Sequence, residues 1–247
     1  MTDLNYSIYY ARFHPDSNAH TETTIDYLMR ELAPALPEDR QATVVDVGCG
    51  YGFALLALQK LGFENVEGVE TSAQQAERAH GFGLKVNVVA DTAVWLGERA
   101  SHFSVVLLRD VLEHVPVPEQ IPLLRAIRQS LVPGGRVIVQ VPNANAILAA
   151  RWRYNDFTHH CSFTEHSLYF VLKNAGFEDI EFSAEMGIVR PSLRLWRKDV
   201  RATFRTLLRR YLVRWCWLQV FKTELPGERL QDISFELNLK AMAFRRA

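Results

Sequence analysis

A glycine-rich turn lies in the first quarter of the chain, directly after a run of β-branched residues. It contains Gly48, Gly50 and Gly52, and the next apolar run ends on the acid Glu70. Glycines let a backbone approach a ligand closely, and a carboxylate at a strand end can accept two hydrogen bonds from a ribose. The types and order of these residues therefore indicate a nucleoside-binding site.

Two further features narrow the kind of nucleoside. Residues 48–52 read G-x-G-x-G, so the dinucleotide fingerprint G-x-G-x-x-G is missing, and there is no phosphate loop ending in Gly-Lys-Ser/Thr. A second acid, Asp91, follows the next apolar run, so we expect it at the same sheet edge. The turn would hold the ligand's polar tail, Glu70 its ribose and Asp91 its base. Alternatively, the glycines only permit a tight turn, Glu70 is a solvated strand end and Asp91 is a helix N-cap.

A second group of residues that could do chemistry lies at 156–160, with the sequence Asp-Phe-Thr-His-His. A histidine can accept a proton from a hydroxyl group near neutral pH, and a carboxylate can orient it. We expect His159, or else His160, to act as a general base with Asp156 as its partner. The alternative is that His159 bonds a backbone group and fixes the loop. A further alternative is a metal site formed by Asp156, His159 and His160. We predict no metal ion, because hard divalent ions prefer carboxylates to adjacent histidines.

The elements that must position these groups alternate from residue 43 onward. Continuous apolar runs alternate with helix-like segments, which predicts an α/β fold with a parallel sheet covered by helices. The predicted strands are residues 43–47, 65–70, 85–89, 103–108, 135–141, 178–184 and 233–244. The predicted helices are residues 52–61, 72–80, 93–99, 119–131 and 164–175, with a loop-like stretch at 142–163. Residues 1–42 read as an N-terminal helical extension with a helix at 21–32.

A long insertion at about residues 187–229 separates the last two predicted strands. Residues 190–222 contain ten Arg and Lys residues and one acid, Asp199, and their apolar residues recur at helical spacing. This pattern predicts a basic amphipathic helix. We expect it to lie on an anionic membrane, to pack on the domain or on a second copy in a homodimer, or to bind substrate phosphate. Nucleic acid is not an expected partner, because the chain as a whole has a formal net charge of zero.

In combination, these motifs resemble those of class I S-adenosylmethionine-dependent methyltransferases. The resemblance covers about residues 27–184, and the segments that carry it are Val44 to Gly52, Glu70, Asp91, Arg109 to Val115 and Leu131 to Gly135. It implies a Rossmann-like sheet of seven strands, mostly parallel, with the last strand antiparallel and inserted in the sheet, within a methyltransferase domain at 43–247.

The resemblance also implies S-adenosylmethionine as the cofactor. The residues that it assigns to cofactor binding are Asp46, Gly48, Cys49, Gly50, Glu70, Thr71, Asp91, Thr92, Arg109, Asp110 and His114. In the alternative interpretations, His114 is a structural histidine at a helix start, and Cys49 is a small turn residue rather than a nucleophile.

The segment after the fifth predicted strand resembles a narrower group of methyltransferases. The pattern Asp-x-Thr-His at 156–159, followed by Phe163-Thr164 and a helix, is similar to a subgroup found with polysaccharide and glycolipid biosynthesis. That resemblance implies O-methylation of a sugar hydroxyl on a cell-surface polysaccharide, such as an O-antigen, or on a lipid-linked glycan. The alternatives are a methyltransferase for a free small molecule of the quinone or aromatic-precursor type, and a non-catalytic cofactor-binding scaffold.

The amino-acid composition indicates the class of protein and the cellular compartment in which it is found. The 247 residues are 48% hydrophobic and 23% charged, which is typical of an ordinary soluble globular protein. The three cysteines, Cys49, Cys161 and Cys216, form no CxxC pair, so neither a disulfide framework nor a zinc knuckle is expected. We find no signal-peptide pattern and no uncharged apolar run near the roughly 20 residues that span a bilayer. These features predict a cytoplasmic protein that is peripheral on the inner membrane face if its basic helix binds lipid.

Overall fold

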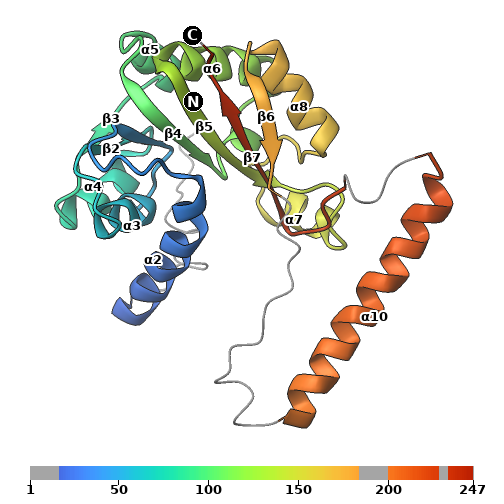
Figure 1. Cartoon of the computed structure of the whole chain (residues 1–247). Helices are drawn as coiled ribbons and strands as arrows, with labels where there is room; N and C mark the ends of the chain where they lie inside the picture. Colours follow the sequence, from blue (N-terminus) through green and yellow to red (C-terminus); the bar gives the residue numbers. More distant parts are fainter. Residues whose placement is uncertain (1–16, 184–199, 228–232, 247) are drawn as a thin grey trace.

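The computed structural model of the chain describes residues 17–183, 200–227 and 233–246 (Figure 1). Its centre is a seven-stranded sheet in the order β3-β2-β1-β4-β5-β7-β6. The strands are β1 (Val44–Val47), β2 (Val66–Glu70), β3 (Val86–Val88), β4 (Phe103–Arg109), β5 (Leu131–Pro142), β6 (Glu178–Phe182) and β7 (Asn238–Phe244). Strand β7 runs antiparallel to both β5 and β6, and the pairs among β1 to β5 are parallel. The expected Rossmann-like sheet with an inserted antiparallel strand is confirmed.

Helices cover both faces of this sheet, and they bury alternate residues of each central strand. The helices are α2 (Asn18–Leu32), α3 (Phe53–Lys60), α4 (Ala73–Gly81), α5 (Thr92–Gly97), α6 (Val117–Ser130), α7 (Ala149–Asn155), α8 (Glu165–Asn174) and α10 (Val200–Glu224), with short 3-10 helices η1 (Ala33–Ala35) and η2 (Leu112–His114). In β4, Val105 and Leu107 belong to the apolar cluster formed with α2, α3 and α4. Val106 and Leu108 belong to the cluster formed with α5, α6 and α8. A strand buried on both faces must be apolar throughout, which explains its sequence.

The N-terminal helix α2 is part of the domain core. Its side chains Ile25, Leu28 and Leu32 are buried in the same cluster as β1. The helix begins at Asn18, three residues before the predicted start, because the Ser17 hydroxyl accepts the backbone N–H of His20 at 3.2 Å. That bond satisfies one of the amides that a helix start leaves unpaired.

Strand β5 begins at Leu131 rather than at residue 135, and two further segments differ from the sequence prediction. Residues 149–155 form the short helix α7, where a loop was expected. Strand β7 begins at Asn238 rather than at residue 233, because the preceding backbone has other partners. The Asn143 side chain donates to the carbonyl oxygens of Ser234 and Glu236, and Glu165 accepts the backbone N–H of Ser234. Those groups are therefore not available to extend the sheet.

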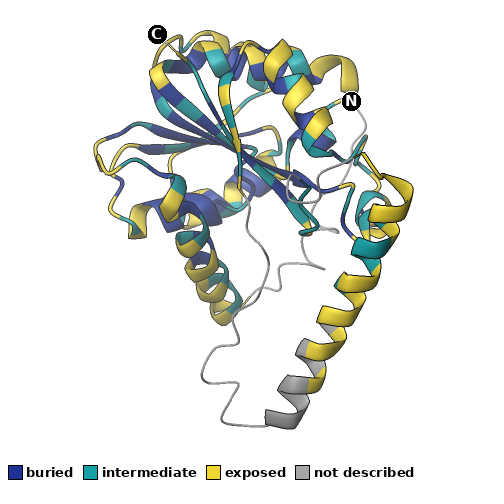
Figure 2. Ribbon diagram, turned by 45° about the vertical axis from the view of Figure 1, so that its right-hand side comes forward, coloured by how far each residue is buried: buried dark blue, intermediate teal, exposed yellow. Residues whose placement is uncertain are grey.

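The predicted helix of the insertion is present as α10, which extends away from the sheet (Figure 1). Among the described residues, the contacts that join it to the domain include an ion pair of Arg214 with Glu236 at 3.3 Å and a hydrogen bond from Trp217 Nε1 to the Asn145 carbonyl at 3.1 Å. Phe221 also packs edge-on against Phe235. Much of its remaining surface is exposed (Figure 2). Residues 187–199 and 228–229 of the predicted insertion lie outside the described residues.

Candidate functional site

The glycine turn between β1 and α3 has the backbone geometry that only glycine adopts readily. Gly48, Gly50 and Gly52 have φ angles of 68°, 52° and 79°. A Cβ atom at Gly48 would also lie 2.6 Å from a methyl carbon of Val111, so the turn packs closely against the segment that follows β4. Any larger residue at position 48 would separate these two segments, which both lie at the sheet edge where ligands bind in this fold class.

Glu70 and the turn are in direct contact. One Glu70 carboxylate oxygen accepts the backbone N–H of Gly50 at 2.9 Å. The other accepts the backbone N–H groups of Thr71 and Ser72, each at 2.8 Å. Glu70 is buried and thereby holds the turn and the start of α4 in one arrangement. Its contact with a ribose, and that of Thr71, stay predictions.

Asp46 of β1 is buried, and it lies close enough to the partly buried Arg109 of β4 for the guanidinium to act on its carboxyl group. Burial raises the pKa of Asp46 to about 7, against the effect of the Arg109 guanidinium. Arg109 donates to Glu31 of α2 at 3.0 Å and to Gln140 of β5 at 3.2 Å. The structure therefore gives Arg109 a role in joining α2 to the sheet, and contact with the cofactor stays a prediction.

Asp110 has an uncommon backbone conformation at the end of β4. Its φ angle is 54°, and its carboxylate accepts the Gln140 side-chain amide at 2.8 Å. Non-glycine residues with positive φ cost free energy and are frequent at functional sites, so this position agrees with the predicted role of Asp110 near the ligand.

Two of the predicted cofactor residues have evident structural roles. Cys49 is buried against β2, where a Cβ atom at Gly68 would lie 2.5 Å from its sulfur, and burial raises the pKa of its thiol. This supports the interpretation of Cys49 as a small turn residue. Asp91 accepts the backbone N–H groups of Ala93 and Val94 at 2.8 and 3.1 Å, so it is the N-cap of α5, which begins at Thr92. Adenine contacts by Asp91 and Thr92 stay predictions.

A second cluster lies where η2 meets the loop after α7. His114 belongs to η2, and Asp156, Thr158 and His159 belong to the loop. The loop is fixed to η2 because the backbone N–H of His160 donates to the Glu113 carbonyl at 2.7 Å. The His160 side chain is exposed, so the structure favours His159 over His160 among the predicted bases.

A hydrogen-bond chain runs from Asp156 through Thr158 to His114. The Thr158 hydroxyl lies 2.6 Å from the Asp156 carboxylate and 2.7 Å from His114 Nδ1. Hydrogen bonds from the Thr158 hydroxyl and backbone N–H outweigh the opposing effect of burial and lower the pKa of Asp156, so Asp156 is an ionised acceptor. The Thr158 hydroxyl must donate its single proton to this carboxylate, and it therefore accepts from His114 Nδ1. This assigns the proton of neutral His114 to Nδ1 and leaves a lone pair on Nε2.

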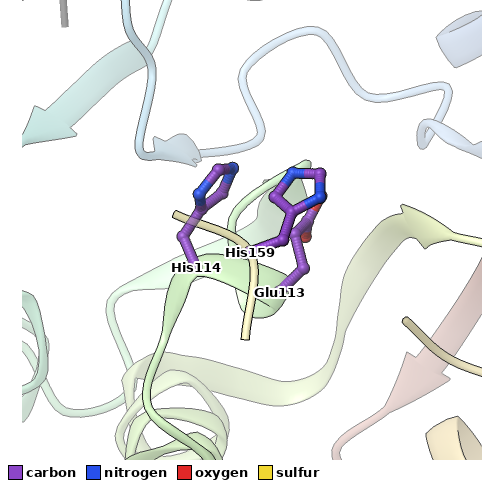
Figure 3. Close-up of side chains that lie close together, drawn as sticks. All are labelled: Glu113, His114 and His159. Carbon is purple, nitrogen blue, oxygen red and sulfur yellow. The ribbon is translucent and has the colours of Figure 1, made fainter. Parts of the chain in front are cut away.

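His159 lies beside His114 but is held less firmly. The two rings have their centroids 4.6 Å apart, and Figure 3 shows the Glu113 carboxylate beside the His159 ring. His159 Nε2 is 4.0 Å from Asp156, beyond hydrogen-bond distance. The predicted His159–Asp156 pair is therefore close in space, but the carboxylate bonds Thr158 instead.

Both histidines are neutral near pH 7. Burial, and then the neighbouring His159, lower the pKa of His114 to about 4. Burial also lowers the pKa of His159, against the effects of Asp156 and of the Trp152 backbone. Neutral imidazoles can accept protons or bind metal ions.

Glu113 was not among the predicted site residues. Ligand atoms of Glu113, His114 and His159 lie within 4.8 Å of one another, so this trio could hold a divalent ion. Among the described residues, Glu113 Oε2 and His159 Nδ1 are buried without a hydrogen-bond partner. Burial raises the pKa of Glu113 well above its usual range. This trio shares only His159 with the set of Asp156, His159 and His160 that the sequence offered for a metal. The Glu-His pair in the segment after β4 was the available signal.

Comparison with known proteins gives consistent matches. Residues 19–181 match the family model described as a methyltransferase domain. The chain is 32% identical over 179 residues to the ubiquinone biosynthesis O-methyltransferase of Ruegeria pomeroyi, which covers 64% of this chain and 71% of that protein. A SAM-dependent methyltransferase from Archaeoglobus fulgidus has a similar structure, with a TM-score of 0.67 and 16% identity over 98% of this chain and 100% of that chain.

A second solved structure carries a ligand relevant to the turn. Phosphoethanolamine N-methyltransferase 2 of Haemonchus contortus, in complex with phosphomonomethylethanolamine and S-adenosylhomocysteine, matches with a TM-score of 0.61 and 16% identity. The match covers 98% of this chain and 60% of that chain.

Proposed function

We propose that this chain methylates a hydroxyl oxygen of a small aromatic acceptor. The premise is that the chain belongs to the class I S-adenosylmethionine-dependent methyltransferases. The chain is an enzyme of this family and uses S-adenosylmethionine. The sequence favoured a sugar hydroxyl as acceptor. The relative from Ruegeria pomeroyi instead supports the alternative, a free molecule of the quinone or aromatic-precursor type.

The observation that carries the proposal is the state of His114. Its pKa is lowered to about 4, so it is a weak base whose Nε2 lone pair is free. A weak base removes a proton more readily from a phenolic hydroxyl, with a pKa of about 10, than from an aliphatic hydroxyl, whose pKa lies closer to the value of about 15.7 for water. The electrostatics of the cluster thus support an aromatic acceptor over a sugar.

The residues at the turn fit the cofactor. The close approach at Gly48 leaves no room for a side chain, and the carboxylates of Asp46 and Glu70 lie next to the turn. The turn would hold the methionine part and Glu70 the ribose. When bound, S-adenosylmethionine supplies an electrophilic methyl group on a positively charged sulfur.

The chain's own residues would then manage the acceptor proton. His114 Nε2 would take the proton of the acceptor hydroxyl as the acceptor oxygen becomes the nucleophile for the methyl group. The positive charge that forms on the imidazole is stabilised by Asp156 through Thr158, which also fixes the ring orientation. The proton then leaves to water. This proposal makes His114 the base, and His159 a neighbour that lowers its pKa.

An acceptor panel tests this function. Purified protein with S-adenosylmethionine is assayed for S-adenosylhomocysteine release with catechol-type phenols and with free and nucleotide-linked sugars. We expect turnover with phenols, a loss of about 10²–10⁴-fold in His114→Ala, and unchanged S-adenosylhomocysteine binding by calorimetry. Turnover with sugars alone would overturn the acceptor proposal, and full activity of His114→Ala would overturn the role of His114.

A further inference from the structure

Helix α10 combines positive charge with exposed apolar surface, away from the methyl-transfer site. Its sequence contains six Arg and Lys residues and one carboxylate, Glu224, in a chain that is neutral overall. Among its described side chains, large apolar groups are between 44% and 66% exposed; these are Leu208, Tyr211, Leu212, Val213, Trp215 and Val220. A soluble protein rarely leaves such a continuous apolar surface in water, so this surface is expected to have a partner.

The exposed and the docked faces of α10 are distinct. Arg214, Trp217 and Phe221 follow helical spacing and contact the domain. The exposed residues Leu208, Tyr211, Leu212 and Trp215 have the spacing i, i+3, i+4, i+7, which places them on one other face. The contacts with the domain therefore leave this second face uncovered in the described part of the chain.

An apolar hollow adjoins the helix. It has a volume of about 350 Å³ and is lined by Ile147, Leu212, Val213, Cys216, Trp217 and Val220. Its walls are almost wholly apolar, so it suits a hydrocarbon chain and offers little to a polar ligand.

We propose that α10 lies on an anionic lipid surface. Arg205 and Arg209 are exposed and would contact lipid headgroups, and Tyr211 and Trp215 would enter the interface between headgroups and acyl chains. The hollow beside Ile147 would receive part of an acyl chain. Within the described residues no helix is long and apolar enough to cross a bilayer, so α10 lies along the surface.

The positive charge of α10 favours an anionic lipid surface over a second copy of the chain as its partner. A two-fold symmetric pair uses the same patch on both copies, so two α10 helices would bring their arginines together. An anionic surface instead neutralises these charges. The inference does not depend on the identity of the methyl acceptor, and a failure of one proposal leaves the other intact.

Vesicle co-sedimentation tests the proposal on the full chain. The vesicles are phosphatidylcholine alone, or phosphatidylcholine with phosphatidylglycerol, each at low and high salt. We expect binding to the anionic vesicles that weakens at high salt. The variant Arg205→Glu/Arg209→Glu should lower the partition coefficient roughly 30-fold or more, since each cation contributes about fivefold. Tyr211→Ala/Trp215→Ala should also lower it.

Matched variants away from α10 provide the controls. Lys60→Glu/Lys173→Glu changes the net charge equally, and Phe82→Ala/Val94→Ala removes exposed apolar groups from the domain. We expect both to bind vesicles as the native chain does, and all four variants to bind S-adenosylhomocysteine. Absence of binding at low salt would overturn the proposal, and so would equal losses in the control variants. A dimer without lipid that Tyr211→Ala/Trp215→Ala dissociates, together with no vesicle binding, would assign the face to a second copy.

Discussion

The Glu70 carboxylate accepts the backbone N–H of Gly50 at 2.9 Å, so the acid that ends β2 shapes the turn that follows β1. The carboxylate is consequently a structural anchor as well as the expected ribose ligand, and the two roles can be separated by experiment.

Replacement of Glu70 by Gln should impair both roles. The amide nitrogen of Gln is a donor, and it would oppose one of the backbone N–H groups of Gly50, Thr71 and Ser72. We expect a loss of about 1–3 kcal/mol in unfolding free energy and at least tenfold weaker S-adenosylhomocysteine binding. Thermal unfolding and calorimetry measure these. Glu67→Gln on the same strand is the matched control, and equal affinities in the two variants would contradict the ribose role.

Thr158 should act as a positioning residue through its hydroxyl group. Thr158→Val keeps the shape but removes the bond that fixes the proton of His114 on Nδ1. We expect kcat to fall about tenfold or more with KM nearly unchanged, because only the orientation of the base is lost. Thr158→Ser keeps the hydroxyl and should restore most of the rate. If Val and Ser variants behave alike, the hydrogen-bond chain has no catalytic role.

The pH profile of methyl transfer should not show the loss of activity that protonation of a histidine with an ordinary pKa would cause. His114 works in its neutral form, and its pKa is lowered to about 4. The rate should therefore stay level as pH falls from 8 to 6 and decline only toward its lowered pKa, whereas an ordinary histidine would be half-protonated near pH 6.5. Circular dichroism at each pH establishes that the protein remains folded. A half-maximal rate near pH 6.5 in folded protein would refute the assignment.

Asp46 should make stability depend on pH. Its pKa is raised from 3.8 to about 7, so the folded state binds its proton more tightly than the unfolded state. That stabilisation is complete below pH 4 and is lost as pH rises to about 7. Relative to the native chain, Asp46→Asn should gain about 2–4 kcal/mol between these limits and then level off. Urea unfolding across this range measures the difference, with the exposed Asp26→Asn as control. A constant difference would argue against the buried proton.

Dialysis against a chelator should leave the methyl-transfer rate unchanged if His114 carries the proton. The alternative is that Glu113, His114 and His159 bind a divalent ion. A rate lost on dialysis and restored by a divalent ion in the native chain, but not in His159→Ala, would assign the trio to a metal. In that case the metal, and not the free imidazole, would activate the acceptor hydroxyl.

The sheet could be predicted from the sequence because its strands are continuous apolar runs. Helix α7 could not, because it is short and its N-cap, Leu148, makes no side-chain capping bond. The hydrogen-bond partner of Asp156 also could not be predicted from the spacing of residues in the sequence. Asp156 accepts the backbone N–H of Thr158 in a local turn, and this directs its carboxylate toward Thr158 and away from His159. Sequence separation alone gave His159 and Asp156 as the pair.

The order of the strands has a consequence for synthesis on the ribosome. Within the described parts of the chain, β6 pairs with β7 and with no other strand, yet α10 and its flanking residues are made between them. During translation, the β5 edge therefore stays open and β6 has no strand to pair with until β7 emerges. The basic helix is exposed to the cell before the sheet is closed, so the nascent chain could encounter its partner surface before the enzyme has finished folding.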